Sequence, residues 1–591
     1  MPALTHRPIV LLAAAISVGA HLWLVFSGLV PTLISRPLHM ALALPFVFLF
    51  AEARSATRRI CGWIALAAGW IGCFYILLDR PALSDQYGAL QGWGQYALAV
   101  ALILVALEMA RRAIQPVLPA IALLTLLYGL LGEHIPGSFG HPGIPLDYFL
   151  GALVIAEGGL WGQLTGISVD LIVPFVILGA FVSSGEAGNG FMSLSTQLAG
   201  RFRAGAAKVA VLASALYGTI SGSASANVAS TGAVTIPAMK RLGYPSSMAA
   251  AVEAVASTGG QIMPPVMGAG IFLMAELLRT TYAELMVVAV LPAILFFLTS
   301  WFGVHHFAVR YDLRGLDPSA LPGWARVART MPFFLLPFGV LVGMLMGGDY
   351  GAAYSAVFAT AATVLLLPVD SQSGPSLALF WRRVQEALLE AARQIALIAS
   401  IVICAGLIVG TFAMTGLGVK ITSLIVGVSG GRLWVAMLLT AAACIVLGME
   451  LPTTAAYLIC IAVAGPALVK LGLEPLHAHM FVFWYALLCT ITPPVCGNVY
   501  IAASIAETPW LPVAWQSLRI GLGLFMVPLG FVANPSMLLF TAAPALALLA
   551  AAKVGIGVWL LSYAAIRADG AWPLRAAAAV TALPIIFAWG I

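Results

Sequence analysis

Long apolar runs fill most of the sequence, separated by short polar or glycine- and proline-rich connections. A membrane-crossing helix needs about 20 mostly apolar residues, and roughly sixteen or seventeen hydrophobic segments follow one another along the chain. We therefore predict an all-α polytopic membrane protein in which some segments enter the membrane without crossing it. The clearest spans are expected near residues 9–30, 38–51, 60–78, 93–110, 116–132, 167–184, 283–307, 331–347 and 351–368.

One polar stretch, Tyr217–Glu276, interrupts this apolar pattern. It concentrates Ser, Thr, Gly, Asn and Gln and contains the pair Pro264-Pro265. In hydrocarbon an unpaired backbone group costs several kcal/mol, so irregular backbone survives only inside protein or beside a watery cavity. The stretch is therefore expected to hold a binding site.

The segment Thr219–Asn227 (TISGSASAN) has the chemistry of an alkali-cation site. Hard cations prefer carbonyl and hydroxyl oxygens, which unwound backbone and these Ser and Asn side chains supply. Helix N-termini at the same break would also attract a carboxylate. The alternative is that the small residues only let transmembrane helices approach closely.

Paired prolines mark two further helix breaks. Ser257–Met267 (STGGQIMPPVM) is echoed by Thr490–Asn498 (TITPPVCGN). Proline removes a backbone donor and clashes with the preceding turn, so each pair should stop a helix, as a re-entrant segment requires. A loop at the membrane surface is the alternative, but apolar sequence on both sides argues against it.

Three landmarks recur at nearly constant spacing. Gly218 and Gly448 are separated by 448 − 218 = 230 residues, Pro264 and Pro493 by 493 − 264 = 229, and Phe181 and Phe412 by 412 − 181 = 231. A long internal repeat is typical of transporters whose two halves build one site near the bilayer midplane. The spacing alone does not show whether the halves are inverted.

Several ionisable residues lie within or beside the apolar segments. In GMELPTTAAY (Gly448–Tyr457), Glu450 is a candidate for function because a carboxylate at membrane depth is costly, although it could also lie at the water line. Glu253 and Glu276 are comparable, and Glu276 could pair with Arg279. His477 and His479, in a loop-like stretch, are expected at the membrane interface.

A charge cluster and a proline near residues 112–116 predict a domain boundary. Residues 1–115 would form a four-helix block, and residues 116–591 the transport and scaffold region. Within that region, repeat one is expected at about 150–310 and repeat two at about 385–510. The C-terminal segments 517–534, 537–562 and 572–590 (517–590 together) have the plain apolar character of scaffold helices.

Composition supports the membrane assignment and excludes other classes. Of the 591 residues 62% are hydrophobic and only 8% are charged, against about 25% charged in soluble domains. The net charge of +6 comes from Arg in short loops, as the positive-inside rule requires, and does not suggest nucleic acid. The seven cysteines show no metal or disulfide spacing, and no nucleophile motif or phosphate loop is present, so we expect no enzyme and no cofactor.

At these motifs the sequence resembles the membrane component of TRAP transporters, the tripartite ATP-independent periplasmic transporters. The closest resemblance is to the fused type, with four plus twelve helices, that works with TAXI-class binding proteins. The similarity covers about residues 150–510 and is carried by SALYGTISGSASANVASTGAVTIPAMKRLGY, EAVASTGGQIMPPVMGAGIFLMAE, GMELPTTAAYLI and TPPVCGN. The first four spans look like the fused small subunit.

The resemblance implies an elevator-type fold with two inverted repeats, each adding a re-entrant hairpin to a moving transport domain. The hairpin tips would lie near Ser221–Asn227 and Gly448–Thr454. Substrate would contact Ser223, Ala224, Asn227, Thr453, Thr454 and Asn498. Sodium would be held by Ser221, Gly222, Ser223, Asn227, Gly259, Gly448, Thr453, Thr492 and Pro493. Glu450 departs from the small or apolar residue typical of the family and admits proton coupling.

The expected function is import of a small organic anion, with a carboxylate favoured, across the bacterial inner membrane. A periplasmic substrate-binding protein of the TAXI type would deliver the substrate, and Na⁺ or H⁺ would be the coupling ion. A stand-alone divalent-anion carrier that needs no binding protein is the alternative. The sequence offers no clear intramembrane Arg that would grip a carboxylate, so it does not name the substrate.

Overall fold

The fold is almost entirely helical. The computed structural model describes residues 8–50, 55–114, 116–348, 350–449, 451–567 and 572–588. Within these residues nine helices are long and apolar enough to cross a membrane, or up to eleven if two bent helix pairs count as single spans. Further apolar helices of 10–17 residues lie between them, because helix breaks divide the apolar runs. The predicted all-α polytopic membrane fold is confirmed.

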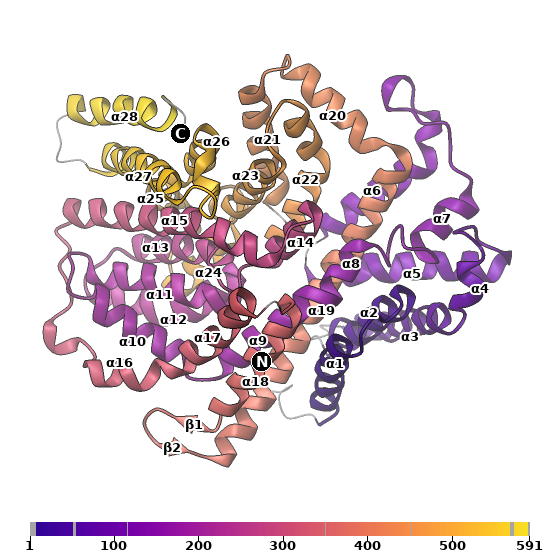
Figure 1. The fold of residues 1–591 in the computed structure, drawn as a ribbon, viewed down its shortest axis with the longest axis horizontal. Helices are drawn as coiled ribbons and strands as arrows, with labels where there is room; N and C mark the ends of the chain where they lie inside the picture. The colour runs from indigo at the N-terminus through magenta and orange to yellow at the C-terminus, as the bar shows by residue number, and fades with distance from the viewer. Residues whose placement is uncertain are drawn as a thin grey trace.

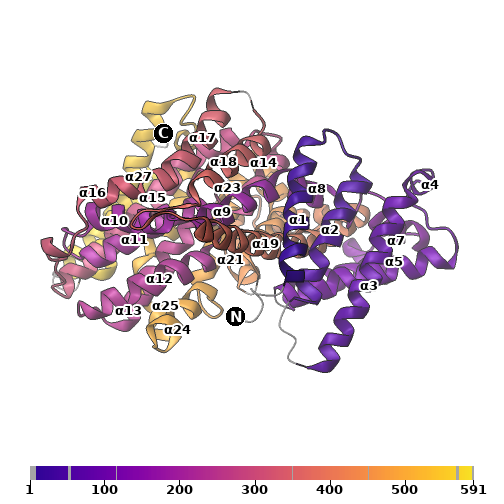
Figure 2. The same cartoon turned by 90° about the horizontal axis from the view of Figure 1, so that it is seen from below.

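The N-terminal block lies at one end of the long axis of the molecule (Figures 1 and 2). Its helices are α1 (Pro8–Phe26), α2 (Thr32–Phe48), α3 (Ala56–Leu78), the short α4 (Arg80–Ser84) and α5 (Gly92–Ala113). The expected start of the second span at residue 38 was wrong. The helix begins at Thr32 and contains both Pro37 and Pro45, which it accommodates in its interior.

A 39-residue helix, α19 (Leu377–Thr415), is the central support of the fold (Figure 1). At 1.5 Å per residue it is roughly 58 Å long, more than a bilayer core requires. It packs against α1, α2 and α5 of the N-terminal block. It also packs against α6 (Val117–Leu131) and α9 (Val173–Ser184), and so joins the N-terminal block to the rest of the chain.

Polar contacts fix the N-terminal block to the segment that precedes α9. The guanidinium of Arg36 donates to the Trp161 carbonyl and lies 3.9 Å from the Glu157 carboxylate. Nearby, the imidazole of His21 contacts that of His39 at 2.8 Å, and His39 reaches the Ser168 hydroxyl at 3.1 Å. Both histidines are buried, so these polar groups satisfy one another across the contact.

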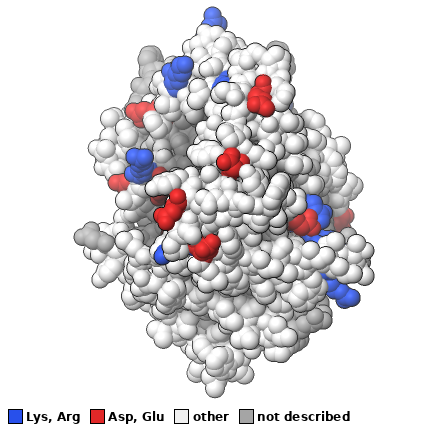
Figure 3. Space-filling model, turned by 90° about the vertical axis from the view of Figure 1, so that its right-hand side faces the viewer, with Lys and Arg blue, Asp and Glu red and all other residues white. Residues whose placement is uncertain are grey.

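The outer face of the N-terminal block is largely uncharged (Figure 3). Helix α3 exposes large apolar side chains, among them Ile60, Trp63, Ile64, Ile71 and Phe74. Monomeric soluble proteins rarely expose apolar patches of this size, and a membrane protein turns such faces toward lipid. This surface therefore fits the membrane assignment.

Two similar series of helices follow within residues 205–278 and 433–506. The first consists of α11 (Gly205–Ser221), α12 (Ala224–Arg241), α13 (Ser246–Thr258) with the 3₁₀ turn η4 (Gly259–Gln261), and α14 (Ala269–Leu278). The second consists of α21 (Leu433–Gly448), α22 (Thr453–Lys470), α23 (Pro475–Leu488) with η6 (Cys489–Ile491), and α24 (Gly497–Ala506). Each is a helical hairpin followed by a broken helix.

The two series cross. Helix α14 of the first packs against α22 and α23 of the second, while α24 of the second packs against α12 and α13 of the first. Each broken helix therefore places its second half against the other hairpin.

The remaining elements connect and flank these series. Before them come the 3₁₀ turns η1 (Gly132–His134) and η2 (Gly137–Phe139), α7 (Leu146–Val154), α8 (Gln163–Ile167), the π-helical segment η3 (Ser168–Ile172) and α10 (Ala187–Ala199). Between them lie α15 (Tyr282–Arg310), η5 (Pro318–Ala320), α16 (Trp324–Thr330), α17 (Pro332–Gly347), α18 (Ala352–Leu366), the antiparallel strands β1 (Val369–Asp370) and β2 (Gly374–Pro375), and α20 (Leu417–Val428).

The C-terminal region differs from two of the three expected spans, 517–534 and 537–562, whereas a helix over Trp572–Phe587 lies within the third, 572–590. Its elements are α25 (Trp510–Ile520), η7 (Leu522–Phe525), α26 (Val527–Ala533), η8 (Pro535–Leu538), α27 (Pro544–Ile566) and α28 (Trp572–Phe587). The expected span 517–534 is a pair of helical segments bent by 64°. The expected span 537–562 begins only at Pro544, because the 3₁₀ turn η8 occupies its first residues.

Candidate transport site

The first hairpin turns at Gly222. Helix α11 ends at Ser221, Gly222 has a left-handed backbone (φ +55°), and α12 begins at Ala224. The Ser223 hydroxyl accepts a hydrogen bond from the Ala226 amide at 3.4 Å and so caps α12. A helix start of this kind presents partly unpaired backbone amides and the positive end of the helix dipole. The predicted tip at Ser221–Asn227 coincides with this turn.

The first hairpin lies directly on the first broken helix. A Cβ on Gly222 would come within 2.6 Å of the Met267 carbonyl oxygen, and one on Gly218 would clash with the Gly260 Cα. Only glycine permits backbones to approach this closely. The hairpin tip and the Pro264-Pro265 break therefore form one unit.

The second series repeats this arrangement. Helix α21 ends at Gly448 and α22 begins at Thr453, so the break falls within the predicted tip Gly448–Thr454. A Cβ on Gly448 would lie 2.6 Å from the Cys489 sulfur. Since 489 − 260 = 229, this contact corresponds to that of Gly218 with Gly260. Glu450, the candidate for proton coupling, lies outside the described residues.

Both proline pairs interrupt helices, as predicted. The Pro264-Pro265 and Pro493-Pro494 bonds are cis, and each pair lies between the two halves of a broken helix. The Tyr282 hydroxyl donates to the Pro265 carbonyl at 2.6 Å, and the Tyr500 hydroxyl donates to the Pro494 carbonyl at 2.8 Å. The breaks are therefore held in place by side chains outside them.

Asn498, at the start of α24, joins the two series. Its amide nitrogen donates to the Thr258 hydroxyl at 2.8 Å and contacts the Thr490 hydroxyl at 3.2 Å. Its amide oxygen accepts from the Ser225 hydroxyl in the first hairpin at 3.3 Å. Asn498 is fully buried, so one side chain connects the first tip with the ends of α13 and α23.

The predicted substrate residues divide between the two tips. Ser223 and Ala224 begin α12, Thr453 and Thr454 begin α22, and within the described chain no hydrogen bond joins one pair to the other. Asn498 is instead brought to the first tip. Asn227 is turned inward: it is fully buried, and its amide nitrogen donates to the Ser214 carbonyl at 2.8 Å.

The predicted sodium residues also cluster at the breaks. In the first series the Ser221 hydroxyl contacts the Ser223 carbonyl at 3.4 Å, while Gly259 packs against the ring of Phe296. In the second series the Thr492 hydroxyl, next to Pro493, donates to the Leu488 carbonyl at 2.7 Å. The donor set is hydroxyl and carbonyl oxygen, the chemistry that hard cations require.

Sequence reasoning missed two groups of residues. The first is Thr258 and Thr490, which bind Asn498 and were quoted in motifs without being assigned a role, whereas Ser225, which also binds Asn498, was expected as a cation ligand. The second is a cluster around Glu253 that includes Ser214, Thr231, Thr235 and Ser257. The four-residue spacing of Asn227, Thr231 and Thr235 on one face of α12 was the available signal.

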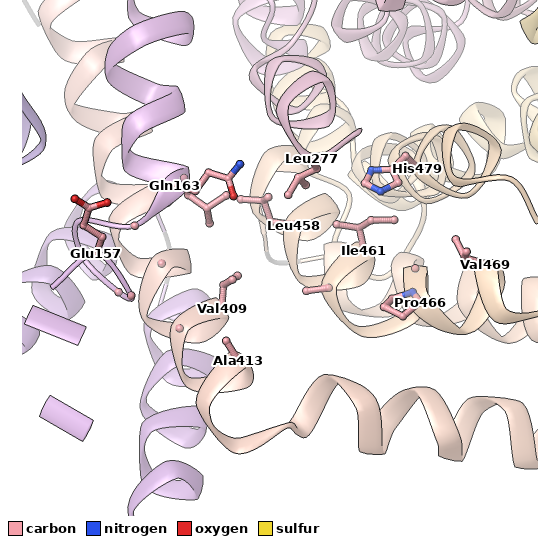
Figure 4. A pocket seen from close by; sticks show the side chains of 18 of the residues that line it. Glu157, Gln163, Leu277, Val409, Ala413, Leu458, Ile461, Pro466, Val469 and His479 are labelled. Atoms are coloured by element: carbon pink, nitrogen blue, oxygen red, sulfur yellow. The ribbon is translucent and has the colours of Figure 1, made fainter. Parts of the chain in front are cut away.

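A cavity of about 670 Å³ lies beside the second hairpin (Figure 4). Figure 4 shows Val409 and Ala413 of α19 on one side and Leu458, Ile461 and Pro466 of α22 on the other. Glu157, Gln163, Lys470 and His479 supply its polar groups. The cavity therefore lies between the central helix α19 and α22 of the second hairpin, and not at the hairpin tips.

The structure differs from two expectations about ionisable residues near this region. His477 and His479 lie in helix α23 and not in a loop-like stretch, and the His479 imidazole contacts the Tyr457 hydroxyl at 2.7 Å. Glu276 accepts a hydrogen bond from the Gln163 amide at 3.1 Å and forms no ion pair with Arg279 among the described residues. The reason is that α14 ends at Leu278 and Arg279 has a left-handed backbone (φ +53°).

Two crossed pairs of a helical hairpin and a broken helix, with glycines, hydroxyls and carbonyls at the breaks, define a membrane transport protein. Comparison with known families then specifies which one. Residues 101–546 match the family described as "Tripartite ATP-independent periplasmic transporter, DctM component". The chain belongs to this family, the large permease of TRAP transporters, and is a multi-pass protein of the inner membrane.

Curated relatives carry the same designation. The C4-dicarboxylate TRAP transporter large permease protein DctM of Pseudomonas aeruginosa is 26% identical over 61% of this chain and 82% of its own length. The ectoine/5-hydroxyectoine permease UehC of Ruegeria pomeroyi is 26% identical over 72% of this chain and 97% of its own. The isethionate permease protein DctMQ of Oleidesulfovibrio alaskensis is 22% identical over 64% of this chain and 61% of its own length.

Proposed function

We propose that this TRAP-type transporter imports a small organic anion, in particular a carboxylate, by secondary active transport driven by a sodium gradient. The proposal also includes coupling to a proton gradient, either in place of the sodium gradient or together with it. The observation that carries it is the crossing of the two hairpin and broken-helix series, joined at Asn498. The names of the three relatives support a small polar solute: a C4-dicarboxylate, ectoine and isethionate.

The ion and substrate sites are proposed at the helix breaks. Sodium would bind near Ser221–Asn227 with Gly259, and near Gly448–Thr453 with Thr492 and Pro493. The substrate carboxylate would lie between the N-termini of α12 and α22, where the helix dipoles favour negative charge. No Arg is needed at the site in this scheme.

The conformational change is proposed to be an elevator motion. The crossed helices α11–α14 and α21–α24 would move as one body against α19 and the N-terminal block. The cavity between α19 and α22 supports this, because an interface with open space and glycines on both sides can slide. Gly406 and Gly410 of α19 pack closely on the Gly159 and Gly158 carbonyls.

Delivery of the substrate by a periplasmic binding protein of the TAXI type is part of the proposal. The family description names a tripartite, periplasmic system, which supports a soluble partner. The fused arrangement, with residues 1–115 as the small subunit, is supported by the docking of that block on α19 and by the DctMQ relative.

The test is uptake by purified protein in proteoliposomes, with a candidate binding protein loaded with substrate. A sodium gradient, a proton gradient, both or neither is imposed. Accumulation should need the binding protein and at least one gradient. Uptake that ignores both gradients would contradict secondary active transport. Uptake without the binding protein would favour the stand-alone divalent-anion carrier.

A further inference from the structure

Glu253 of α13 lies at the centre of a polar cluster beneath the first hairpin tip. Its side chain is fully buried. Its Oε1 atom accepts hydrogen bonds from the Ser214 and Ser257 hydroxyls at 3.0 Å each and from the Thr231 hydroxyl. Its Oε2 atom accepts from the Thr235 hydroxyl. An ionisable residue buried at membrane depth is costly and is a functional candidate by default.

Among the described residues no basic side chain neutralises this carboxyl group. Within the described chain these hydroxyls, and no Lys, Arg or His, are the groups that interact with it. The helices packed on α13 are α11, α12, α15, α24 and α25, together with η6, and α24 contains no Asp, Glu, Lys, Arg or His.

The other titratable groups of these helices contact other partners or lie at helix ends. Lys208 of α11 lies over the rings of Phe202 and Trp301, and Tyr217 binds Ser230. Lys240 and Arg241 end α12 and bind the Ala506 and Pro237 carbonyls. Glu284, His305, His306 and Arg310 lie toward the ends of α15, Arg519 lies in the last turn of α25, and the Cys489 thiol donates to the Ala486 carbonyl.

The second series shows that the fold does not need this cluster. Before the hairpin tip, a residue of the second series has a number 230 higher than its counterpart in the first. After the tip the difference is 452 − 223 = 229, because Ser223 precedes α12 and Pro452 precedes α22. The counterparts of Ser214, Asn227, Thr231, Thr235, Glu253 and Ser257 are then Cys444, Ala456, Cys460, Ala464, Val482 and Ala486. Contact between the Cys444 and Cys460 side chains matches that between Ser214 and Thr231, which supports the alignment.

The hydroxyl groups of the cluster can serve both the ionised and the protonated carboxyl group. The Thr235 hydroxyl has two acceptors within reach, Glu253 Oε2 and the Thr231 carbonyl at 3.0 Å. When the carboxyl is ionised, Thr235 donates to it. When it is protonated, it can donate to Thr235, which then donates to the Thr231 carbonyl. Both states are therefore fully hydrogen-bonded.

A proton fits this site better than a sodium ion. The carboxylate oxygens and the four hydroxyls are already in direct hydrogen-bond contact, which leaves no space for a cation between them. Sodium would need those oxygens to separate around it. Among the expected sodium residues, Asn227 contacts Thr231 of the cluster, and within the described chain no hydrogen bond joins any of them to Glu253 itself.

The cluster reaches the tip through Asn227. The Thr231 hydroxyl lies 2.8 Å from the Asn227 carbonyl oxygen and 3.2 Å from its amide oxygen. The Asn227 amide nitrogen binds the Ser214 carbonyl, and a Cβ on Gly260 would lie 2.7 Å from that nitrogen. A change of charge at Glu253 therefore acts on a residue that packs against both the hairpin and the broken helix.

We propose that Glu253 binds and releases a coupling proton during the transport cycle, so that the first repeat carries a proton site that the second lacks. This inference rests on the proposed function of the chain as a gradient-driven importer. It assigns the proton to a buried carboxyl group in the first series, distinct from Glu450.

The test compares Glu253→Gln with wild type in proteoliposomes. Glutamine keeps the shape and resembles the protonated carboxyl group: its amide oxygen can accept from Ser214, Ser257 and Thr231, its amide nitrogen can donate to Thr235, and it cannot lose a proton. We expect Glu253→Gln to retain exchange of substrate across the membrane and to lose all stimulation by a pH gradient. The matched control, Glu386→Gln on the exposed face of α19, should behave as wild type. The proposal would be overturned if a pH gradient drove as much accumulation in Glu253→Gln as in wild type. It would also be overturned if Glu253→Gln lost only sodium-driven uptake.

An infrared measurement keeps the proposal testable even if Glu253→Gln does not fold. Purified wild-type protein should show a protonated carboxylic-acid carbonyl band that disappears as the pH is raised. Thr235→Val removes a hydrogen-bond donor that stabilises the ionised carboxylate, so the band should disappear at a higher pH in this variant than in wild type. A band that does not titrate, or that Thr235→Val leaves unmoved, would overturn the assignment. If wild type shows no gradient-driven uptake at all, the proposed function fails, while this titration still decides the protonation of Glu253.

Discussion

At the scale of single residues, two buried asparagines have different roles. Asn498 joins the two series through hydroxyl groups at three breaks, whereas Asn227 connects the first tip to the Glu253 cluster. Buried amides of this kind are stabilising only while their partners are present. Their removal should therefore affect both stability and transport.

Asn498→Ala should destabilise the protein and abolish uptake. It removes the hydrogen bonds that the buried amide makes with the Thr258, Thr490 and Ser225 hydroxyls, at a net cost of about 0.5–1.5 kcal/mol each. Asn534→Ala is the control, because Asn534 is equally buried but binds Gly530 and Ile586 carbonyls away from the breaks. The temperature of thermal unfolding should fall by a similar amount in both variants. Uptake per folded molecule should be lost only in Asn498→Ala, and equal uptake in both would contradict the role of Asn498.

The sequence predicted which residues lie at the breaks but not which of them touch. Ser221–Asn227, Gly448–Thr454 and the two proline pairs follow from local chemistry, because glycine and proline stop helices wherever they occur. The contact of Ser225 with Asn498 spans 273 residues and depends on how the two series cross. Local pattern contains no information about that crossing.

At the scale of elements, the close contact between the first hairpin and the first broken helix depends on glycine. Gly222 needs a left-handed backbone and also lies against the Met267 carbonyl. Gly416, between α19 and α20, has a similar backbone (φ +66°) with no atom near its Cβ position. The two positions separate the cost of backbone conformation from the cost of a lost contact.

Gly222→Ala should reduce uptake far more than Gly416→Ala. Both changes carry the left-handed backbone cost of about 1–2 kcal/mol. Only Gly222→Ala also pushes the hairpin tip away from the broken helix. Thermal unfolding and uptake should be measured on both. If the two variants transported equally well, the hairpin contact would not matter for function.

Arg383 fixes the start of α19. Its guanidinium donates to the Glu186 carboxylate at 2.6 Å and to the Leu367 carbonyl at 3.0 Å, and both charged groups are nearly buried. Arg383→Ala should cost about 3–5 kcal/mol, because it leaves a buried carboxylate unpaired. The neighbouring Arg382 is exposed, so Arg382→Ala should cost less than about 1 kcal/mol. Denaturant unfolding of the two variants compares them, and similar losses would contradict this account.

At the scale of the whole molecule, the chain divides into a supporting part and a crossed part. The N-terminal block lies at one end, α19 runs through the middle, and the crossed series contact α19 through α22 (Figures 1 and 2). The N-terminal helices and the recurring helix breaks were predictable from the sequence, because apolar runs and recurring glycines and prolines mark them. The length of α19 and the cavity beside it were not predictable, because the helix bounds and the packing gap arise from tertiary contacts.

The proposed mechanism requires that ions and substrate bind between the breaks of both series at once. The most direct measurement is the rate of thiol labelling at Ser225→Cys and Thr454→Cys, one at each tip, with the exposed Cys61 replaced by Ser. Ser423→Cys on the exposed face of α20 is the control. Adding the coupling ion with the loaded binding protein should slow labelling at both tips, with the same midpoint in ion concentration, and leave Ser423→Cys unchanged. Protection at only one tip, or different midpoints at the two, would contradict a single shared site.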